Sequence, residues 1–225
     1  NYPFWFEFFT ALKYRVVLSP PSTRKIYELG IESIPSESEC YPAKLAHGHV
    51  TWLIKQGVPF IFYPCIPYER NEFPDSNNHY NCPIVTSYAE NIKNNIDELK
   101  DGSIRFENPF LSFASEDTIC KQMIKAFPDI PKEEVRAAVK TGWQELARTR
   151  QAMYDKGEET LKWMEENGRH GIVLAGRPYH IDSEINHGIP ELINSYGLAV
   201  LTEDSVSNRN LPERPLIVMD QWMYH

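Results

Sequence analysis

The sequence predicts an α/β fold with Rossmann-like lobes, in which parallel sheets are flanked by helices and a helical segment joins the lobes. Short apolar runs typical of strands alternate with helical patterns, as in βαβ units. The runs at 58–65 and 171–176 are continuously apolar, which is typical of sheets covered on both faces. We therefore expect a first lobe at 1–116, a helical connector at 117–168, and the start of a truncated second lobe at 169–225.

The first lobe is expected to open with a helix, because Phe4, Phe8 and Leu12 recur at helical spacing. A short buried strand should follow at 14–20, where two prolines stop it. Proline at a first helical position and glycine at a helix end then predict the helix that begins near Cys40 and ends at Gly57. The other elements expected in this lobe are a helix at 22–31, a strand at 58–65, a long polar loop at 66–83, a strand at 84–88, a helix at 90–100 and an irregular stretch at 103–118.

The connector at 117–168 is expected to be helical throughout. Pro131 stands at a helix start, glutamates follow in the first turn, and apolar residues recur with a period near 3.6. The second lobe should contain a buried strand at 171–176, a loop at 177–188, a helix at 189–197 and a last strand at 198–204.

Composition excludes several classes of function. The 225 residues are 42% hydrophobic and 12% aromatic, which is enough to build a core. A net charge of −8 argues against nucleic acid or an anionic membrane as the main partner. No apolar run approaches the roughly 20 residues of a membrane span. Both ends look cut, so we expect a segment of a longer protein. The four cysteines do not form a secreted disulfide framework, which favours a reducing cytoplasm.

Three cysteines stand at turns beside prolines, in the sequences CYP, PCIP and CP. Cys40 lies at a helix N-terminus, where free N–H groups and the helix dipole favour a thiolate. Cys65 ends a strand, at the sheet edge where parallel sheets bind ligands. Cys82 closes the long loop. Three thiolates suit an iron–sulfur cluster with one open iron, and they suit zinc with an open position almost as well.

A plainer interpretation of these three cysteines is that they are unrelated and buried, because free cysteine is among the most buried residue types. Cys120 lies in a helical pattern with apolar neighbours, so we expect it in the core. His47 and His49 are two residues apart on a helix, do not share a face, and are not expected to form a joint metal site.

The segment GRPYHIDSEINHG gathers polar side chains between a strand and a helix. It is either a polar loop that caps the helix or the wall of a ligand crevice, in which Arg177 meets a phosphate or carboxylate. A metal-hydrolase site has no recognised spacing here and ranks third. No Walker-type loop, GxGxxG or GxSxG occurs, so nothing predicts bound ATP, a dinucleotide or a serine-hydrolase elbow.

Four stretches resemble one family: IPSESECYPAKLAHGH, FIFYPCIPYE, NHYNCPIVTSYAENIKNN and AGRPYHIDSEINHGIPELINSYGLAVLTEDSV. The chain resembles the domain of uncharacterised function found in large CoA-substrate-specific enzyme activases, the proteins labelled activators of (R)-2-hydroxyglutaryl-CoA dehydratase. The resemblance extends over most of the chain.

The resemblance implies Rossmann-like lobes and a [4Fe–4S]-type cluster in the cleft, as in the related 2-hydroxyacyl-CoA dehydratase subunits. Carried onto this sequence, it gives Cys40, Cys65 and Cys82 as cluster ligands. It also implies low-potential electron transfer to a 2-hydroxyacyl-CoA dehydratase. Its other implied partners are ATPase domains of the same polypeptide. ATP belongs to those domains, which this chain lacks, so we expect no nucleotide hydrolysis here.

This sequence differs from the dehydratase subunits in the cysteines of its second lobe. The second lobe contains no cysteine, whereas dehydratase subunits take a ligand from a later lobe. Either Cys82 completes the set or a ligand lies beyond residue 225. On the hypothesis we favour, Arg177, Tyr179 and His180 line the opposite wall of the crevice. The alternative is a non-catalytic docking or scaffold module, whose contacts would use the exposed face of the 132–166 helices.

Overall fold

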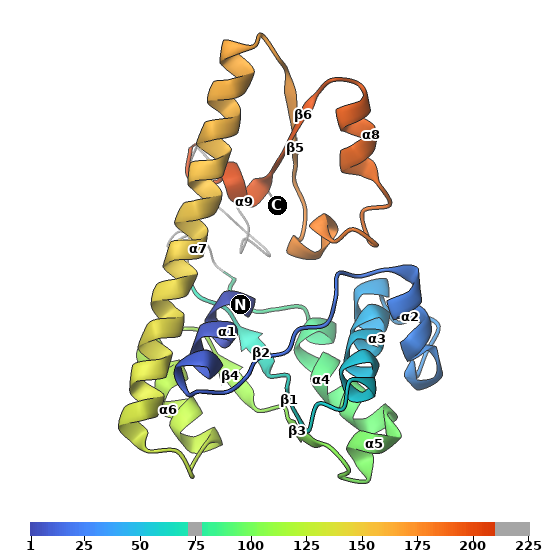
Figure 1. Cartoon of the computed structure of the whole chain (residues 1–225), viewed down its shortest axis with the longest axis vertical. Coiled ribbons are helices and arrows are strands. Elements are labelled where there is room, and N and C mark those ends of the chain that lie inside the picture. Colours follow the sequence, from blue (N-terminus) through green and yellow to red (C-terminus); the bar gives the residue numbers. More distant parts are fainter. Residues whose placement is uncertain (72–77, 210–225) are drawn as a thin grey trace.

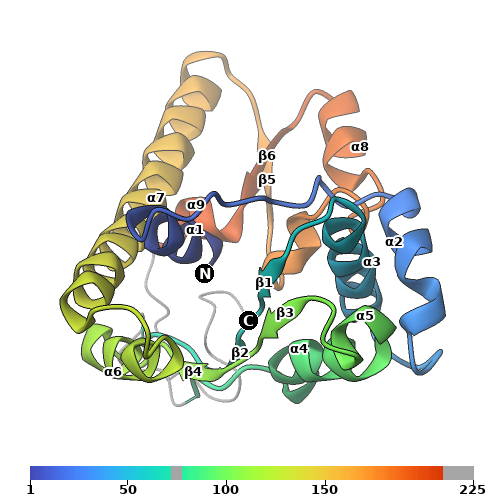
Figure 2. The same cartoon turned by 60° about the horizontal axis from the view of Figure 1, so that its bottom comes forward.

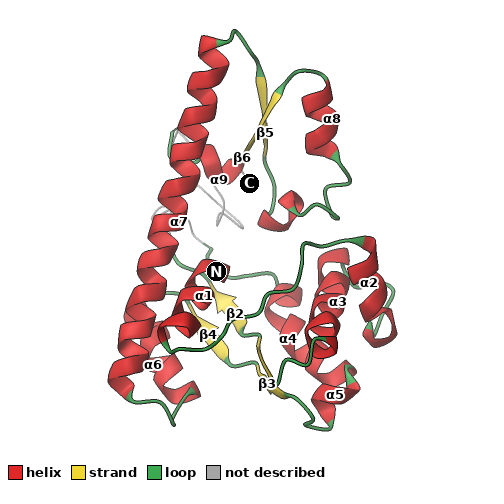
Figure 3. Cartoon of the chain, viewed as in Figure 1, coloured by secondary structure: helices red, strands yellow, loops and turns green. Residues whose placement is uncertain are grey.

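The computed structural model describes residues 1–71 and 78–209. Short parallel strand pairs lie among helices, which confirms the expected α/β fold (Figures 1 and 3). The parallel pairs in this part of the chain are β1 (Phe60–Phe62) with β3 (Arg105–Glu107), β2 (Cys65–Tyr68) with β4 (Phe110–Ser112), and β5 (Gly171–Leu174) with β6 (Ala199–Thr202).

The helices provide most of the mass around these strands. Their bounds are α1 Tyr2–Ala11, α2 Arg24–Gly30, α3 Tyr41–Lys55, α4 Pro83–Asn95, α5 Asp97–Lys100, α6 Glu116–Ala126, α7 Lys132–Glu166, α8 Ile189–Ser195 and α9 Glu203–Val206, with 3₁₀ turns η1 Ile31–Ser33 and η2 Pro178–Ile181. Side-chain caps fix some of the starts: Thr23 accepts the N–H of Ile26, and Ser115 accepts that of Thr118. None of the described helices has both the length and the apolar character needed to cross a membrane.

The strands of the first lobe form one kinked parallel ladder. Between β1 and β2, the N–H of Tyr63 donates to the carbonyl of Glu107 at 2.9 Å, and that of Cys65 donates to Pro109 at 3.0 Å. Pro64 lies between those two donors and has no N–H to contribute. The hydrogen-bonded ladder therefore continues on both sides of Pro64. Cys65 follows this proline directly, at the start of β2.

Two hydrophobic clusters form the core of the first lobe. One joins α1, β4, α6 and the start of α7 and is centred on fully buried Phe4, Phe8 and Phe113. The other joins α3, α4, α5 and the β1–β3 pair, and it includes Cys65 and Ile92. Cys120 lies in the first cluster, as predicted.

Helix α7 belongs to both lobes (Figures 1 and 2). Its first half packs on α1, where Gly142 lies so close that an added Cβ would be 2.8 Å from the carbonyl oxygen of Phe4. Its second half contacts α9 and β6, and Gly157 meets the backbone of Ser205 there. The segment predicted as a separate connector thus contributes to the core of the first lobe.

Several sequence predictions within the first lobe are wrong. Residues 14–20 form no strand and are largely exposed. Residues 84–88, predicted as a strand, lie in α4, because Pro83 starts a helix whose buried face carries Ala89 and Ile92. The β-branched residues of that stretch favour a strand only where the stretch can pair with a neighbouring strand of a sheet.

Other boundaries also differ. The stretch at 103–118 contains β3 and β4, which are too short and too close to Pro109 to leave a periodic signal. The strand predicted at 58–65 divides into β1 and β2 at Pro64. The predicted loop at 66–83 begins inside β2, pairs Tyr68 with Tyr80 in an isolated bridge, and includes residues 72–77, which lie outside the described residues.

The connector and second lobe need corrections too. The continuous helix predicted at 117–168 is broken between α6 and α7. Pro128 follows the C-cap residue of α6, and Pro131 is the N-cap residue of α7. The strand predicted as buried at 171–176 is β5, whose first three residues are exposed. The last predicted strand ends at Thr202, and α9 replaces its final residues.

Candidate functional site

A cavity of about 890 Å³ lies between the lobes. The starts of α3 and α4 form one wall, and η2 with α9 forms the other. The middle of α7 closes one side through residues such as Leu146 and Met153. Arginines and carboxylates both line this cavity, among them Arg70, Arg150 and Glu203.

Two of the predicted cysteines open onto this cavity. Cys40 is the N-cap residue of α3, as predicted, and Cys82 is the N-cap residue of α4. Neither side chain caps its own helix, and a proline follows in the first turn of each. Each thiol therefore stands at a helix N-terminus, the positive end of the helix dipole. The sequence located the first helix start and mistook the second for a strand.

Cys65 occupies a different environment. Its side chain is 0% exposed and packs with Ala89 and Ile92 of α4, and it does not line the cavity. Burial raises the pKa of the Cys65 thiol above its ordinary value, which favours the neutral form. The backbone of Cys65 is fixed by its ladder bond to Pro109. The structure thus brings Cys40 and Cys82 to one cavity and leaves Cys65 in the core behind it.

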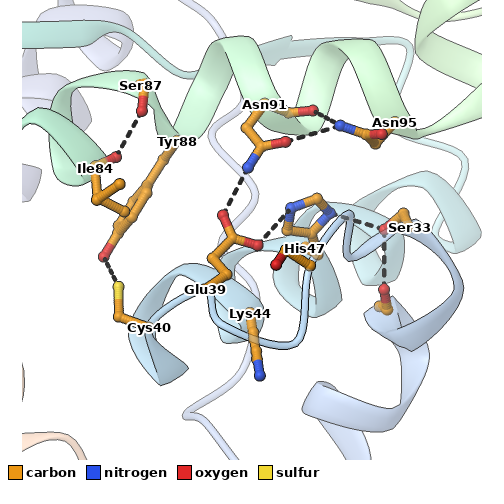
Figure 4. Close-up of polar contacts among 12 residues, drawn as sticks. Ser33, Glu39, Cys40, Lys44, His47, Ile84, Ser87, Tyr88, Asn91 and Asn95 are labelled. Atoms are coloured by element: carbon orange, nitrogen blue, oxygen red, sulfur yellow. Dashed lines mark hydrogen bonds and ion pairs between the residues drawn. The ribbon is translucent and has the colours of Figure 1, made fainter.

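Tyr88 is the residue in contact with the Cys40 thiol (Figure 4). Its hydroxyl oxygen lies 3.6 Å from the sulfur, within hydrogen-bonding range for sulfur. Burial, and after it the bond to Cys40, raises the pKa of Tyr88 above its ordinary value. The phenol therefore stays protonated and can donate to a thiolate. The sequence analysis did not identify Tyr88. It lies six residues after Cys82 in a stretch predicted as a strand, and only the helical conformation of α4 brings it to Cys40.

A polar network fixes the backbone just before Cys40 (Figure 4). Asn91 of α4 donates to Glu39 Oε1 at 2.6 Å. The other carboxylate oxygen faces His47 Nε2 at 4.0 Å, and His47 Nδ1 is 2.8 Å from the hydroxyl of Ser33. His47 is 1% exposed, and its burial lowers its pKa to about 4. Helix α4 therefore contacts both Cys40 and the residue that precedes it.

The opposite wall contains two of its three predicted residues. Arg177 and Tyr179 line the cavity, whereas His180 is exposed and does not. His180 Nδ1 accepts the backbone N–H of Arg177 at 3.1 Å. His180 thus fixes the start of η2, the turn that carries Arg177 and Tyr179.

The cavity contains some of the side chains that could ligate an iron–sulfur cluster. Cys40 and Cys82 supply soft thiol donors on one cavity wall, which suits cluster iron. Cys65 does not join them, and no group of three or more His, Cys, Asp or Glu side chains within 1–71 and 78–209 is arranged to hold a metal ion. The described residues therefore bring two of the three predicted thiols to one cavity and do not form a complete ligand set.

Comparison with known protein families agrees with the sequence resemblance. Residues 1–206 match the family described as the CoA enzyme activase uncharacterised domain (DUF2229). The chain belongs to this family. The match of this CoA enzyme activase domain extends through α9, so it includes both walls of the cavity. Comparisons with curated proteins and with solved structures gave no significant match.

Proposed function

We propose that this CoA enzyme activase domain is the iron–sulfur-binding module of an acyl-CoA dehydratase activase, with Cys40 and Cys82 as thiolate ligands in the interlobe cavity. The observation that carries the proposal is that two cysteines, each at the start of its own helix, open onto one cavity. Helix N-termini favour the thiolate that ligates iron. Cys65 as a third ligand stays a prediction.

The cluster would supply one-electron chemistry at low potential for a 2-hydroxyacyl-CoA dehydratase. The chain's own residues would hold and tune it. Tyr88 would donate a hydrogen bond to the Cys40 thiolate, and Asn91 donates to Glu39, which holds the turn before Cys40 in place. Arg177 on the opposite wall offers positive charge to an anionic group. The ATPase domains of the same polypeptide would supply the ATP hydrolysis, and the setting would be the reducing cytoplasm.

Anaerobic reconstitution with iron and sulfide tests this proposal. Wild-type protein is expected to take up stoichiometric iron and sulfide and to give an electron paramagnetic resonance signal after reduction. Cys40→Ser and Cys82→Ser should each lose most of this iron. Cys120→Ala, which alters a cysteine in the core, is the matched control and should load like wild type. Cys65→Ala decides whether the buried thiol joins the ligand set. Equal iron loading in Cys40→Ser, Cys82→Ser and wild type would reject the proposal.

A second candidate function is a docking module for the ATPase domains. Exposed apolar side chains favour it. They are Trp163 on α7, Ile172 and Val173 on β5, and Ile189 and Leu192 on α8. This candidate predicts that wild-type protein binds no stoichiometric iron. It also predicts that Leu192→Glu weakens binding to purified ATPase domains, whereas Cys82→Ser does not.

A further inference from the structure

A set of hydrogen bonds joins the two lobes on the side of the cavity away from α7 (Figure 1). The bonds connect the segment before α2 and the start of α3 with the loop after η2, about 160 and 143 residues apart in sequence. Helix α7 is the continuous covalent link on the other side. The lobes are thus connected by chain on one side and by polar contacts on the other.

Ser22 is the centre of these contacts. Its side chain is buried, and its hydroxyl donates to Asp182 Oδ2 at 2.5 Å. Because that proton goes to Asp182, the Ser22 oxygen accepts from His49 Nε2, which lies 3.0 Å away. The hydroxyl of Ser183 donates to the backbone carbonyl of Ser22 at 3.2 Å. Three polar groups therefore converge on this one serine.

The second lobe holds its side of the contact rigidly. Asp182 Oδ1 accepts the backbone N–H groups of Glu184 at 2.9 Å and Ile185 at 3.2 Å, which fixes the turn. Glu184 then accepts a hydrogen bond from the hydroxyl of Tyr41 at 2.9 Å. Burial, and then the bond to Glu184, raises the pKa of Tyr41 to about 12.

We propose that Ser22, His49 and Tyr41 on the first lobe and Asp182, Ser183 and Glu184 on the second form a latch that holds the two walls of the interlobe cavity together. The second-lobe part of the latch begins three residues after Tyr179, so releasing it withdraws Arg177 and Tyr179 from the cysteine wall. The latch governs entry to the cavity and the assembly of its two walls. It is made of side-chain hydrogen bonds between lobes, so its opening requires no loss of either lobe's core.

Alkylation of Cys82 by a bulky maleimide reports the opening. Cys82 lines the cavity and is not adjacent to any latch residue, whereas Cys40 precedes Tyr41 directly. The rate is followed by peptide mass spectrometry on the cluster-free protein. The latch bonds of Ser22 and Tyr41 both end on carboxylates, and removing one hydrogen bond to a charged group changes an equilibrium by about tenfold or more. Ser22→Ala and Tyr41→Phe should therefore each raise the Cys82 rate by about that factor, and the double variant should raise it further.

Matched controls separate the latch from general loosening. Tyr27→Phe removes a hydroxyl from the ring that lies tilted against Tyr41, with centroids 5.3 Å apart, and should leave the rate unchanged. Glu184→Gln keeps an acceptor oxygen but not the charge, so its rate should lie between those of wild type and Glu184→Ala, which should resemble Tyr41→Phe. Cys120 in the core reports unfolding and should stay unreactive throughout.

Equal Cys82 rates in wild type, the double variant and Glu184→Ala overturn the latch. So does a rise in Tyr27→Phe that matches the rise in Tyr41→Phe. If a first-lobe variant exposes Cys120, the test rests on Glu184→Gln and Glu184→Ala, because these two variants leave the first lobe unaltered. The outcome is independent of iron uptake, so the latch and the proposed cluster can fail separately.

Discussion

The buried imidazole of His47 makes the stability of the first lobe depend on pH. The pKa of His47 falls to about 4 in the folded protein because burial penalises the charged form. An unfolded histidine titrates near about 6.5. As pH falls below about 6.5, His47 binds a proton in the unfolded chain but not in the folded chain, so the free energy of unfolding decreases. The loss is absent above that pH and grows until about pH 4.

The magnitude follows from the two pKa values. The shift of the His47 pKa from about 6.5 in the unfolded chain to about 4 in the folded protein lowers the free energy of unfolding by about 2 kcal/mol at about pH 5, compared with about pH 7.5. The Glu39 carboxylate, 4.0 Å from Nε2, favours the charged imidazole and makes this an upper figure.

Urea unfolding of wild type and His47→Asn at several pH values measures the effect. Asparagine can keep a polar contact to Ser33 but does not titrate. The destabilisation caused by His47→Asn should shrink by up to about 2 kcal/mol between about pH 7.5 and about pH 5. His49, whose pKa burial also lowers, contributes equally to both proteins and cancels. A difference between the proteins that stays constant over this range would refute the reasoning.

Three substitutions test the packing around the site. Gly48→Ala forces a methyl group against the backbone of Ile26 in α2 and should cost at least about 1–3 kcal/mol in urea unfolding; a neutral result would mean that α2 moves freely. Phe4→Ala, in the core beneath α7, should cost about 3–5 kcal/mol in thermal unfolding, and a loss below about 1 kcal/mol contradicts its central place. Asn91→Ala leaves a carboxylate oxygen of Glu39 without its donor and should cost about 1–3 kcal/mol; an unchanged urea midpoint argues against that bond.

The sequence predicted the parts of the site that depend on local chemistry. Pro42 and the helical pattern after it placed Cys40 at a helix start, and the structure confirms this position. The polar loop after β5 was found because charged residues interrupt an apolar pattern, and Arg177 and Tyr179 line the cavity. The α/β class followed from the same alternation of patterns.

The parts that depend on tertiary contacts were not predictable in this way. Cys65 has the same proline-flanked pattern as its neighbours, yet the ladder turns its side chain into the core. Tyr88 and Asn91 act on the turn at Cys40 only because α4 is a helix, and the β-branched residues at its start indicated a strand. The second-lobe partners of Ser22, Asp182 and Ser183, lie 160 and 161 residues away, beyond the reach of any periodicity.

The length of α7 gives the second lobe a mechanical role. Its 35 residues span about 52 Å, and α1 clamps the lower half against the aromatic core. The upper half therefore works as a lever arm of roughly 26 Å with its fulcrum in the first lobe. A tilt of about 10° at the fulcrum carries the far end of α7 through about 5 Å, and it carries α9, which packs near Gly157, through about 2 Å. Because α7 is one unbroken helix that packs on both lobes, a tilt of its first half also displaces the second lobe.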